Sequence, residues 1–242
     1  MSKILVTICA RGGSKGIPGK NIKPVAGRPL LAYTADIAKE FASRYGADLA
    51  VSTDSEQILR VAAECGLPTD YMRPAELGND VVGKPHVIKD LMLFYEKKNG
   101  YQYDSVIDLD VTSPIRTIED IEGCLKLMED NPDALTVFSV NPCGRNPYFN
   151  MVELKENGFY GLVKENKTTT RQGAPKVYDI NGSVYVYSRA SLMSEDPRAV
   201  TPRTLVYVMN HICFDLDEPA DYDYLAFLLE TGRLQEMGLI KK

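Results

Sequence analysis

A glycine-rich stretch between residues 8 and 21, ICARGGSKGIPGKN, holds the residue types best suited to binding phosphate. Its four glycines allow backbone amides to approach an anion closely, and three cationic side chains add charge to those amides. The cations are Arg11, Lys15 and Lys20, and the hydroxyl of Ser14 stands among them. The spacing fits neither a Walker A loop nor the G-x-G-x-x-G pattern of dinucleotide sites. The stretch therefore predicts a phosphate-binding loop of another class, with a solvated surface loop as the plain alternative.

Two carboxylates near the C-terminal end, Asp215 and Asp217, are candidate ligands for Mg²⁺. Residues 212–216 read as a short strand, and alternation along a strand would put both side chains on one side. Mg²⁺ in nucleotide enzymes commonly binds through one or two carboxylates together with substrate phosphates. On the residues alone, a helix N-cap at Asp217 and a solvated strand end at Asp215 explain the pair equally well.

The residues beside this pair, His211 and Cys213, are ligand types for a soft metal such as zinc. A zinc site generally needs three or four nitrogen or sulfur ligands, and the chain has one further histidine, His86. We therefore interpret His211 as a core or supporting residue. The same scarcity of histidine argues against a triad hydrolase.

The segment from Asp108 to Thr112, DLDVT, matches the D-x-D-x-T pattern of phosphatases that use an aspartyl nucleophile and Mg²⁺. In those enzymes the pattern follows the first strand, whereas here it lies in mid-chain, and a phosphatase would leave the basic loop without a role. An aspartyl phosphatase using Asp108 and Asp110 is kept as the alternative function. A third class, a module that binds nucleotide without turnover, is disfavoured by the combination of loop cations and acidic pair.

Apolar periodicity places these segments on alternating strands and helices. The expected strands cover residues 3–9, 48–53, 69–72, 105–109, 134–140, 182–187, 205–209 and 212–216. The expected helices lie at 30–44, 58–65, 87–95, 117–130, near 190, and at 225–229. This alternation predicts an α/β fold with a doubly wound, mostly parallel sheet.

The alternation breaks over residues 141–176, where turns and a polar run replace the regular pattern. We expect these residues to form an inserted lobe that divides a nucleotide-binding α/β domain into residues 1–140 and 177–242. Segments 150–154 and 158–163 are expected to pair as a hairpin. Because a hairpin is unusual in a parallel fold, the lobe is a candidate for pairing with a second subunit in a homodimer.

The overall composition argues against several classes of protein. The 242-residue chain has 28 Lys and Arg against 33 Asp and Glu, a formal net charge of -5, so nucleic acid is not expected as a partner. Its five cysteines are scattered without C-x-x-C pairs, which suits reduced thiols in a cytoplasm. Neither a signal-peptide pattern nor an apolar run of membrane-spanning length is found. We expect a cytoplasmic protein without membrane contact.

The stretch from Ala10 to Asn21, A-R-G-G-S-K-G-I-P-G-K-N, closely resembles the first signature of the CMP-sugar synthetases, which activate sialic acids and related nine-carbon keto acids. The resemblance implies a Rossmann-like nucleotidyltransferase whose loop wraps the triphosphate of CTP and whose D-x-D, here Asp215 and Asp217, holds Mg²⁺. The catalytic cations that it implies are Arg11, Lys15 and Lys20. The nucleotide-binding residues that it implies are Ala10, Arg11, Gly12, Gly13, Ser14, Asn21, Arg73 and Lys84.

Further motifs extend the resemblance along nearly the full chain. R-P-x-x-L begins at Arg73, L-D-V-T-S-P-I-R at Leu109, R-Q-x-x-P at Arg171, and N-G-x-x-Y at Asn181. The acceptor-sugar residues that these motifs imply are Asp110, Thr112, Ser113, Arg171, Gln172, Asn181 and Tyr185. In the family the arginine often comes from the neighbouring subunit.

Three positions depart from the pattern of many sialic acid members. Asp110 replaces a glutamine that contacts the sugar acid, Lys84 stands at a hydroxyl position near the base, and Asp179 replaces an arginine. The combination of I-C-A-R-G-G-S-K-G, L-D-V-T-S-P, R-N-P-Y-F-N and T-T-R-Q-x-A-P-K-x-Y-D most resembles the legionaminic acid branch.

We therefore predict a homodimeric cytidylyltransferase that transfers CMP from CTP to the anomeric hydroxyl of a nine-carbon keto acid and releases pyrophosphate. N,N'-diacetyllegionaminic acid is the favoured acceptor. Other sialic-acid-like sugars, or a different keto-deoxy sugar acid, are the alternatives within this reaction.

Overall fold

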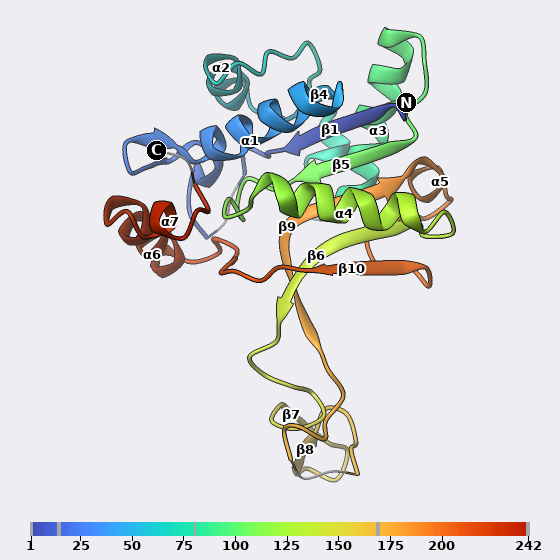
Figure 1. Ribbon diagram of the computed structural model, residues 1–242, viewed down its shortest axis with the longest axis vertical. Coiled ribbons are helices and arrows are strands. Elements are labelled where there is room, and N and C mark those ends of the chain that lie inside the picture. Colours follow the sequence, from blue (N-terminus) through green and yellow to red (C-terminus); the bar gives the residue numbers. More distant parts are fainter. Residues whose placement is uncertain (1, 14–15, 80, 168–169, 241–242) are drawn as a thin grey trace.

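The computed structural model describes residues 2–13, 16–79, 81–167 and 170–240, and six of the described strands form one central sheet (Figure 1). These strands are β1 (Ile4–Cys9), β4 (Asp48–Ser52), β5 (Ser105–Leu109), β6 (Thr136–Pro142), β9 (Tyr178–Ser188) and β10 (Thr204–Val208). Their order is β10-β6-β9-β5-β1-β4, and β9 alone of the six runs antiparallel to its neighbours. The predicted mostly parallel sheet is confirmed.

Helices cover both faces of this sheet (Figure 1). They are α1 (Leu30–Tyr45), α2 (Glu56–Glu64), α3 (Lys84–Asn99), α4 (Ile118–Asp130), α5 (Arg189–Leu192), α6 (Pro219–Glu230) and α7 (Arg233–Glu236). One apolar cluster gathers side chains of α1, α2, α4, α6 and α7, and a second gathers those of α3 and α5. Gly46 and Gly100, both at positive φ, end α1 and α3, because a left-handed residue lets the last carbonyls find a donor.

Strand β1 shows why the sequence forms a sheet covered on both sides. Ile4, Val6 and Ile8 belong to the first apolar cluster, and Leu5 belongs to the second. A strand buried on both faces needs a nearly continuous apolar run, which residues 4–9 supply.

The pairing of β1 brings three functional segments to one edge of the sheet. Cys9 lies opposite Ser52 of β4, and Thr7 lies opposite Asp108 of β5. Because the three strands are parallel, the loop after β1, the segment after β4 and the turn after β5 all leave the sheet at the same edge. Ligand crevices in open α/β sheets lie at this carboxyl edge.

Two of the expected strands are wrong. Residues 69–72 form no strand, because the hydroxyl of Thr69 takes the amide of Tyr71 at 3.1 Å in place of a ladder bond. Residues 212–216 are also irregular, although the amide of Leu216 donates to the Thr112 carbonyl at 2.9 Å. Asp215 and Asp217 therefore lie on an irregular segment and not on a strand.

The chain leaves the sheet after β6 and returns through β9, which is longer than expected. Between them β7 (Val152–Leu154) and β8 (Tyr160–Leu162) pair as an antiparallel hairpin, as predicted. Figure 1 shows this hairpin at the far end of the long axis, reached through the extended ends of β6 and β9.

The remaining described elements are short. They are the paired strands β2 (Pro24–Val25) and β3 (Arg28–Pro29) and the 3-10 turns η1 (Lys20–Ile22) and η2 (Ala75–Leu77). Among the helices of the described residues, none combines the length and the apolar character needed to cross a membrane.

Candidate active site

A cleft of about 470 Å³ opens where β1 and β5 end. Its lining joins predicted site residues from separate parts of the chain: Arg11, Lys20, Asn21, Arg73, Lys84, Asp110, Thr112 and Asp217. The cleft therefore places two cations of the glycine-rich loop, Arg11 and Lys20, in one cavity with carboxylates from two other segments.

The second half of the loop is held by its own side chains and by residues 215–217, here called the acidic segment. Gly19 adopts a φ of 64° and starts the turn η1, whose buried Asn21 donates its side-chain amide to the Arg11 carbonyl at 2.9 Å. Lys20 Nζ donates to the Leu216 carbonyl at 2.6 Å and lies 3.4 Å from Asp217 Oδ1. Ser14 and Lys15, both predicted to bind phosphate, lie outside the described residues.

Gly16 and Asp217 approach so closely that a side chain would not fit. A Cβ built on Gly16 would lie 2.5 Å from the carbonyl oxygen of Asp217. The glycine is thus needed for the contact between the loop and the acidic segment, which gives residue 16 a packing role besides the anion-binding role expected from the sequence.

The first half of the loop already holds an anion supplied by the chain itself. The amide of Gly12 donates to Asp54 Oδ1 at 2.7 Å, while Ala10 is buried and Gly13 is exposed. Asp54 is not among the residues predicted from the sequence, where its only signal is its position just after a strand that ends at the same edge of the sheet.

A cation and two carboxylates form the floor of the cleft. Lys84 Nζ, at the start of α3, lies 2.6 Å from Asp108 Oδ2 and 2.6 Å from Asp110 Oδ2. Asp108 is fully buried and accepts the Thr7 hydroxyl at 2.8 Å. A buried Asp108 cannot attack a phosphoryl group, so the aspartyl phosphatase alternative is wrong.

The charges in this group fix the ionisation of its members. Burial by itself would raise the pKa of Asp110, but the Lys84 charge and two hydrogen bonds from Thr112 lower it to about 2. Burial acts to lower the pKa of Lys84, and the charges of Asp108 and Asp110 raise it well above its ordinary value. Both cleft groups are therefore charged at neutral pH.

Asp217 of the acidic segment lines the same cleft. The negative charge of this segment is less fully compensated than that of Asp110. Partial loss of hydration raises the pKa of Asp215, the Thr112 hydroxyl acts against this, and the negative charges of Asp110 and Asp217 add to the rise. Gathered carboxylates with a raised pKa suit a divalent cation. No group of three or more His, Cys, Asp or Glu within the described residues is arranged to hold a metal. A cation here would accordingly take one or two carboxylates, with phosphate or water oxygens as its other ligands.

Several predicted site residues lie away from the lining of the cleft. Ser113 and Asn181 are buried, and Asn181 bonds Ser139 at 2.6 Å and Asn141 at 2.8 Å. The ring of Tyr185 lies 5.9 Å from Lys84 Nζ. Arg171 and Gln172 are exposed between β8 and β9, where Arg171 donates to the Gly144 carbonyl at 3.0 Å. Within one chain, the structure does not bring these two residues to the cleft.

A cleft at the carboxyl edge of a mostly parallel sheet, lined by loop cations and by carboxylates, defines the class of an α/β nucleotidyltransferase. A family model described as Cytidylyltransferase matches residues 5–201, and the chain belongs to this family. It is thus a nucleotidyltransferase of the cytidylyl-transferring kind.

Two curated relatives match along nearly their whole length. The Post-translational flagellin modification protein B of Campylobacter coli is 36% identical over 236 residues, which cover 97% of this chain and 98% of that protein. The CMP-N,N'-diacetyllegionaminic acid synthase of Campylobacter jejuni is 36% identical over 235 residues, with the same coverage of 97% and 98%.

A solved structure supports the fold. The structure of CMP:2-keto-3-deoxy-manno-octonic acid synthetase complexed with CTP matches with a TM-score of 0.67 at 18% identity, covering 95% of this chain and 99% of that one. At this identity the likeness concerns the fold alone.

Proposed function

We propose that this cytidylyltransferase transfers CMP from CTP to the anomeric hydroxyl of a nine-carbon keto acid, with N,N'-diacetyllegionaminic acid as the favoured acceptor and pyrophosphate as the second product. The contact of Lys20 with Leu216 and Asp217 carries the proposal, because it joins a candidate phosphate-binding cation and one candidate metal ligand, Asp217, in one cleft. The name of the C. jejuni relative supports the acceptor, and the flagellin modification name of the C. coli relative leaves other nonulosonic acids open.

The cations of the loop act on the phosphates. Negative charge builds on the pyrophosphate as it departs, and donors already in place at that position stabilise the transition state. Arg11 and Lys20 line the cleft. We assign this role to them together with Lys15, and we assign phosphate binding also to Gly12, Gly13 and Ser14. Asn21 holds the loop to the Arg11 carbonyl, and we assign Ala10, Arg73 and Lys84 to the nucleotide side.

We assign Mg²⁺ to Asp215 and Asp217. The cation would neutralise phosphate oxygens and so favour attack at the α-phosphate. The raised pKa of Asp215, caused first by partial loss of hydration and then by the charges of Asp110 and Asp217, supports this assignment because a bound cation would offset the repulsion among these carboxylates.

On the acceptor side we assign Asp110 and Thr112 from the cleft, with Ser113, Asn181 and Tyr185 beneath or beside it. Arg171 and Gln172 would reach a sugar from a second subunit, because they lie on the lobe of residues 141–176. The hairpin exposes large apolar side chains, with Val152, Leu154, Phe159 and Tyr160 each at least 60% exposed. Exposed apolar surface of this kind favours a homodimer that covers it. The five free thiols suit a cytoplasmic location.

The reaction is tested by supplying purified protein with CTP, Mg²⁺ and a panel of acceptors, and by measuring pyrophosphate together with the mass of the CMP-sugar. We expect turnover with N,N'-diacetyllegionaminic acid to exceed that with N-acetylneuraminic acid and with eight-carbon keto acids. Failure to release pyrophosphate with every acceptor would reject the function.

Two variants and a size measurement refine this test. Lys20→Ala should lower kcat about 100- to 1000-fold without unfolding the protein, since it removes one transition-state donor. Lys23→Ala removes an exposed cation that lies 4.3 Å from the ring of Tyr222, outside the cleft lining, and is the matched control. Light scattering should give a dimer, and a stable monomer would contradict the assignment of the lobe.

A further inference from the structure

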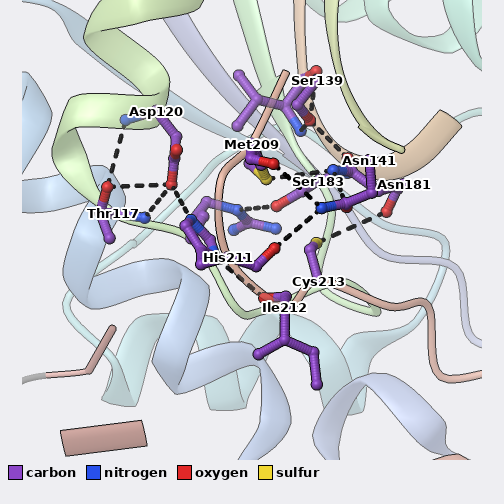
Figure 2. A network of polar contacts seen from close by, with 12 residues as sticks. Thr117, Asp120, Ser139, Asn141, Asn181, Ser183, Met209, His211, Ile212 and Cys213 are labelled. Atoms are coloured by element: carbon purple, nitrogen blue, oxygen red, sulfur yellow. Dashed lines mark hydrogen bonds and ion pairs between the residues drawn. The ribbon is translucent and has the colours of Figure 1, made fainter. Parts of the chain in front are cut away.

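The segment that carries Asp215 and Asp217 is anchored by side chains in place of strand pairing. It follows β10, and Figure 2 shows the polar network that holds its beginning. The side-chain amide of Asn141 donates to the His211 carbonyl at 2.9 Å, and the Cys213 thiol donates to the Asn181 carbonyl at 4.0 Å. These contacts hold the beginning of the segment, while the Leu216 amide, which donates to the Thr112 carbonyl at 2.9 Å, holds it between the two carboxylates.

The His211 side chain adds a contact with helix α4. Its Nε2 lies 2.8 Å from Asp120 Oδ2 in the first turn of α4, and its Nδ1 lies 2.9 Å from the Ile212 carbonyl (Figure 2). A carbonyl oxygen only accepts hydrogen bonds, and so does an ionised carboxylate. A neutral imidazole has one N–H, so it can satisfy one of these two partners. Both contacts are hydrogen bonds only when the ring carries two protons.

Asp120 is held in place and kept ionised by the start of α4. Its Oδ2 accepts the Thr117 amide at 2.7 Å and the Thr117 hydroxyl at 3.0 Å, in the capping box of the helix. Burial alone would raise the pKa of Asp120, but the hydrogen bonds from His211 and Thr117 lower it. The carboxylate is therefore a fixed negative partner for the imidazole.

The other titratable groups around the pair do not compete for this role. Burial raises the pKa of Cys124, near Asp120, and raises the pKa of Cys213 to about 11, so both thiols stay neutral. Loss of hydration also raises the pKa of Tyr207 on β10. Arg116 is positive, and its side chain is engaged with Ser183 at 2.8 Å and Thr34 at 3.0 Å.

We propose that His211, held as an imidazolium by Asp120, is a positioning residue that fixes the segment presenting Asp215 and Asp217 to the cleft. The inference rests on the proposed function for the role of those two carboxylates. Loss of the ring proton removes a hydrogen bond and an ion pair at once, so the segment loosens as the pH rises. The hydrogen bond with Asp120 raises the pKa of His211 above its ordinary value of 6.5, with burial acting in the opposite direction.

The sign of the pH effect follows from these two groups. Because the pKa of His211 is raised on folding, its contribution to stability is fully present below pH 6.5 and is lost as the pH rises through the raised value. Because the pKa of Asp120 is lowered from 3.8, its contribution is present above that value and is lost at lower pH. The anchor is therefore complete between these limits.

The protonation of His211 can be measured directly, because the chain has two histidines. The ring signals are followed by NMR during a pH titration, and His86→Gln assigns them. We expect His211 to titrate above 6.5 in the wild type and to move down in Asp120→Asn, where a neutral amide replaces the carboxylate. A His211 signal that titrates at or below 6.5, or that is unchanged in Asp120→Asn, would overturn the inference.

The positioning role is tested by metal binding. His211→Gln and Asp120→Asn should each weaken Mn²⁺ binding to the protein–CTP complex about 10- to 100-fold, as loss of an outer support of a metal site does. The same variants should raise the Mg²⁺ concentration needed for half-maximal rate more than they lower kcat at saturating Mg²⁺. In the wild type, the Mg²⁺ concentration needed for half-maximal rate should rise with pH. In His211→Gln, this concentration should not depend on pH.

Glu96→Gln is the matched control for a general loss of stability. It weakens the ion pair of Arg189 with a largely buried Glu96, in which Nε and Oε1 lie 2.9 Å apart. Both residues lie outside the segment and outside the cleft lining. We expect Glu96→Gln to leave Mn²⁺ binding unchanged. If it weakened Mn²⁺ binding as much as His211→Gln does, His211 would have only a structural role. If the wild type activates no acceptor, the proposed function fails, while the NMR titration and Mn²⁺ binding still decide the role of His211.

Discussion

Lys84 and Asp110 form an ion pair across the floor of the cleft, with 2.6 Å between Nζ and Oδ2. The sequence presents them as two separate departures from the sialic acid pattern, one on the nucleotide side and one on the acceptor side. In the structure they are a single unit, and the buried Asp108 supports it from below at 2.6 Å from the same Nζ. A change at either position is therefore felt at both.

Replacement of Lys84 should be costly to the fold. Lys84→Met leaves Asp108 buried without its counter-charge, and breaking a buried ion pair from one side costs about 3 kcal/mol. Urea unfolding at neutral pH measures the change. Lys98→Met is the control, because Lys98 pairs with Asp70 at the exposed surface and should have little effect. Equal stability of Lys84→Met and wild type would show that Asp108 is neutralised in another way.

Acid should weaken the same unit. The pKa of Asp110 is lowered from 3.8 to about 2, chiefly by Lys84 and Thr112 acting against burial. Its contribution to stability is thus present above pH 3.8 and is lost as the pH falls toward about 2. We expect the unfolding free energy of the wild type to fall more steeply over this interval than that of Asp110→Asn. Parallel curves would contradict the assignment.

The charge of Asp215 should lower the stability of the ligand-free protein and support CMP transfer. Its raised pKa means that the ionised form is disfavoured in the ligand-free protein, first by loss of hydration and then by nearby carboxylates. Asp215→Asn should raise the melting temperature without ligand and sharply reduce CMP transfer. Calorimetry and pyrophosphate release measure the two effects. A less stable variant would mean that Asp215 makes a favourable contact in the free protein.

Gly16→Ala should separate the loop from the acidic segment. The added methyl group would meet the Asp217 carbonyl at 2.5 Å, so one of the two segments must shift. We expect weaker CTP binding by calorimetry in the presence of Mg²⁺. Gly144→Ala is the control, because its added methyl group has no atom of the described residues within 4 Å apart from those of residues 143–145. Unchanged affinity in Gly16→Ala would show that the segments can move apart without loss.

Local patterns in the sequence were sufficient for most of the architecture. The apolar run of β1 and the helical stripe of α1 are each encoded by neighbouring residues, and both lie where expected. Residues 212–216, which are irregular, are predicted as a strand because their composition is that of one. Whether an apolar run becomes a strand depends on a free neighbouring edge, which no local pattern contains.

The site was predictable where residue type alone signals chemistry. Of the loop cations and the paired aspartates, Arg11, Lys20 and Asp217 line one cleft. Asp215 lies near enough to Asp110 and Asp217 that, besides loss of hydration, their charges raise its pKa. The supporting groups were not found, because Asp54, Asp108 and Asp120 act through partners distant in the sequence: Gly12, Lys84 and His211. Carboxylates of this kind acquire their roles from the pairing of strands and helices, so only the folded chain reveals them.

The hydrogen bond from the Gly12 amide to Asp54 has a consequence for how nucleotide enters. An anion arriving at this amide does not occupy an empty donor, since it must exchange with a carboxylate that the protein already provides. Under the proposed function, the displaced carboxylate would lie near a phosphate of the same charge and would weaken its binding. The Asp54 contact would thus lower the affinity of the loop for the nucleotide and for the pyrophosphate that leaves.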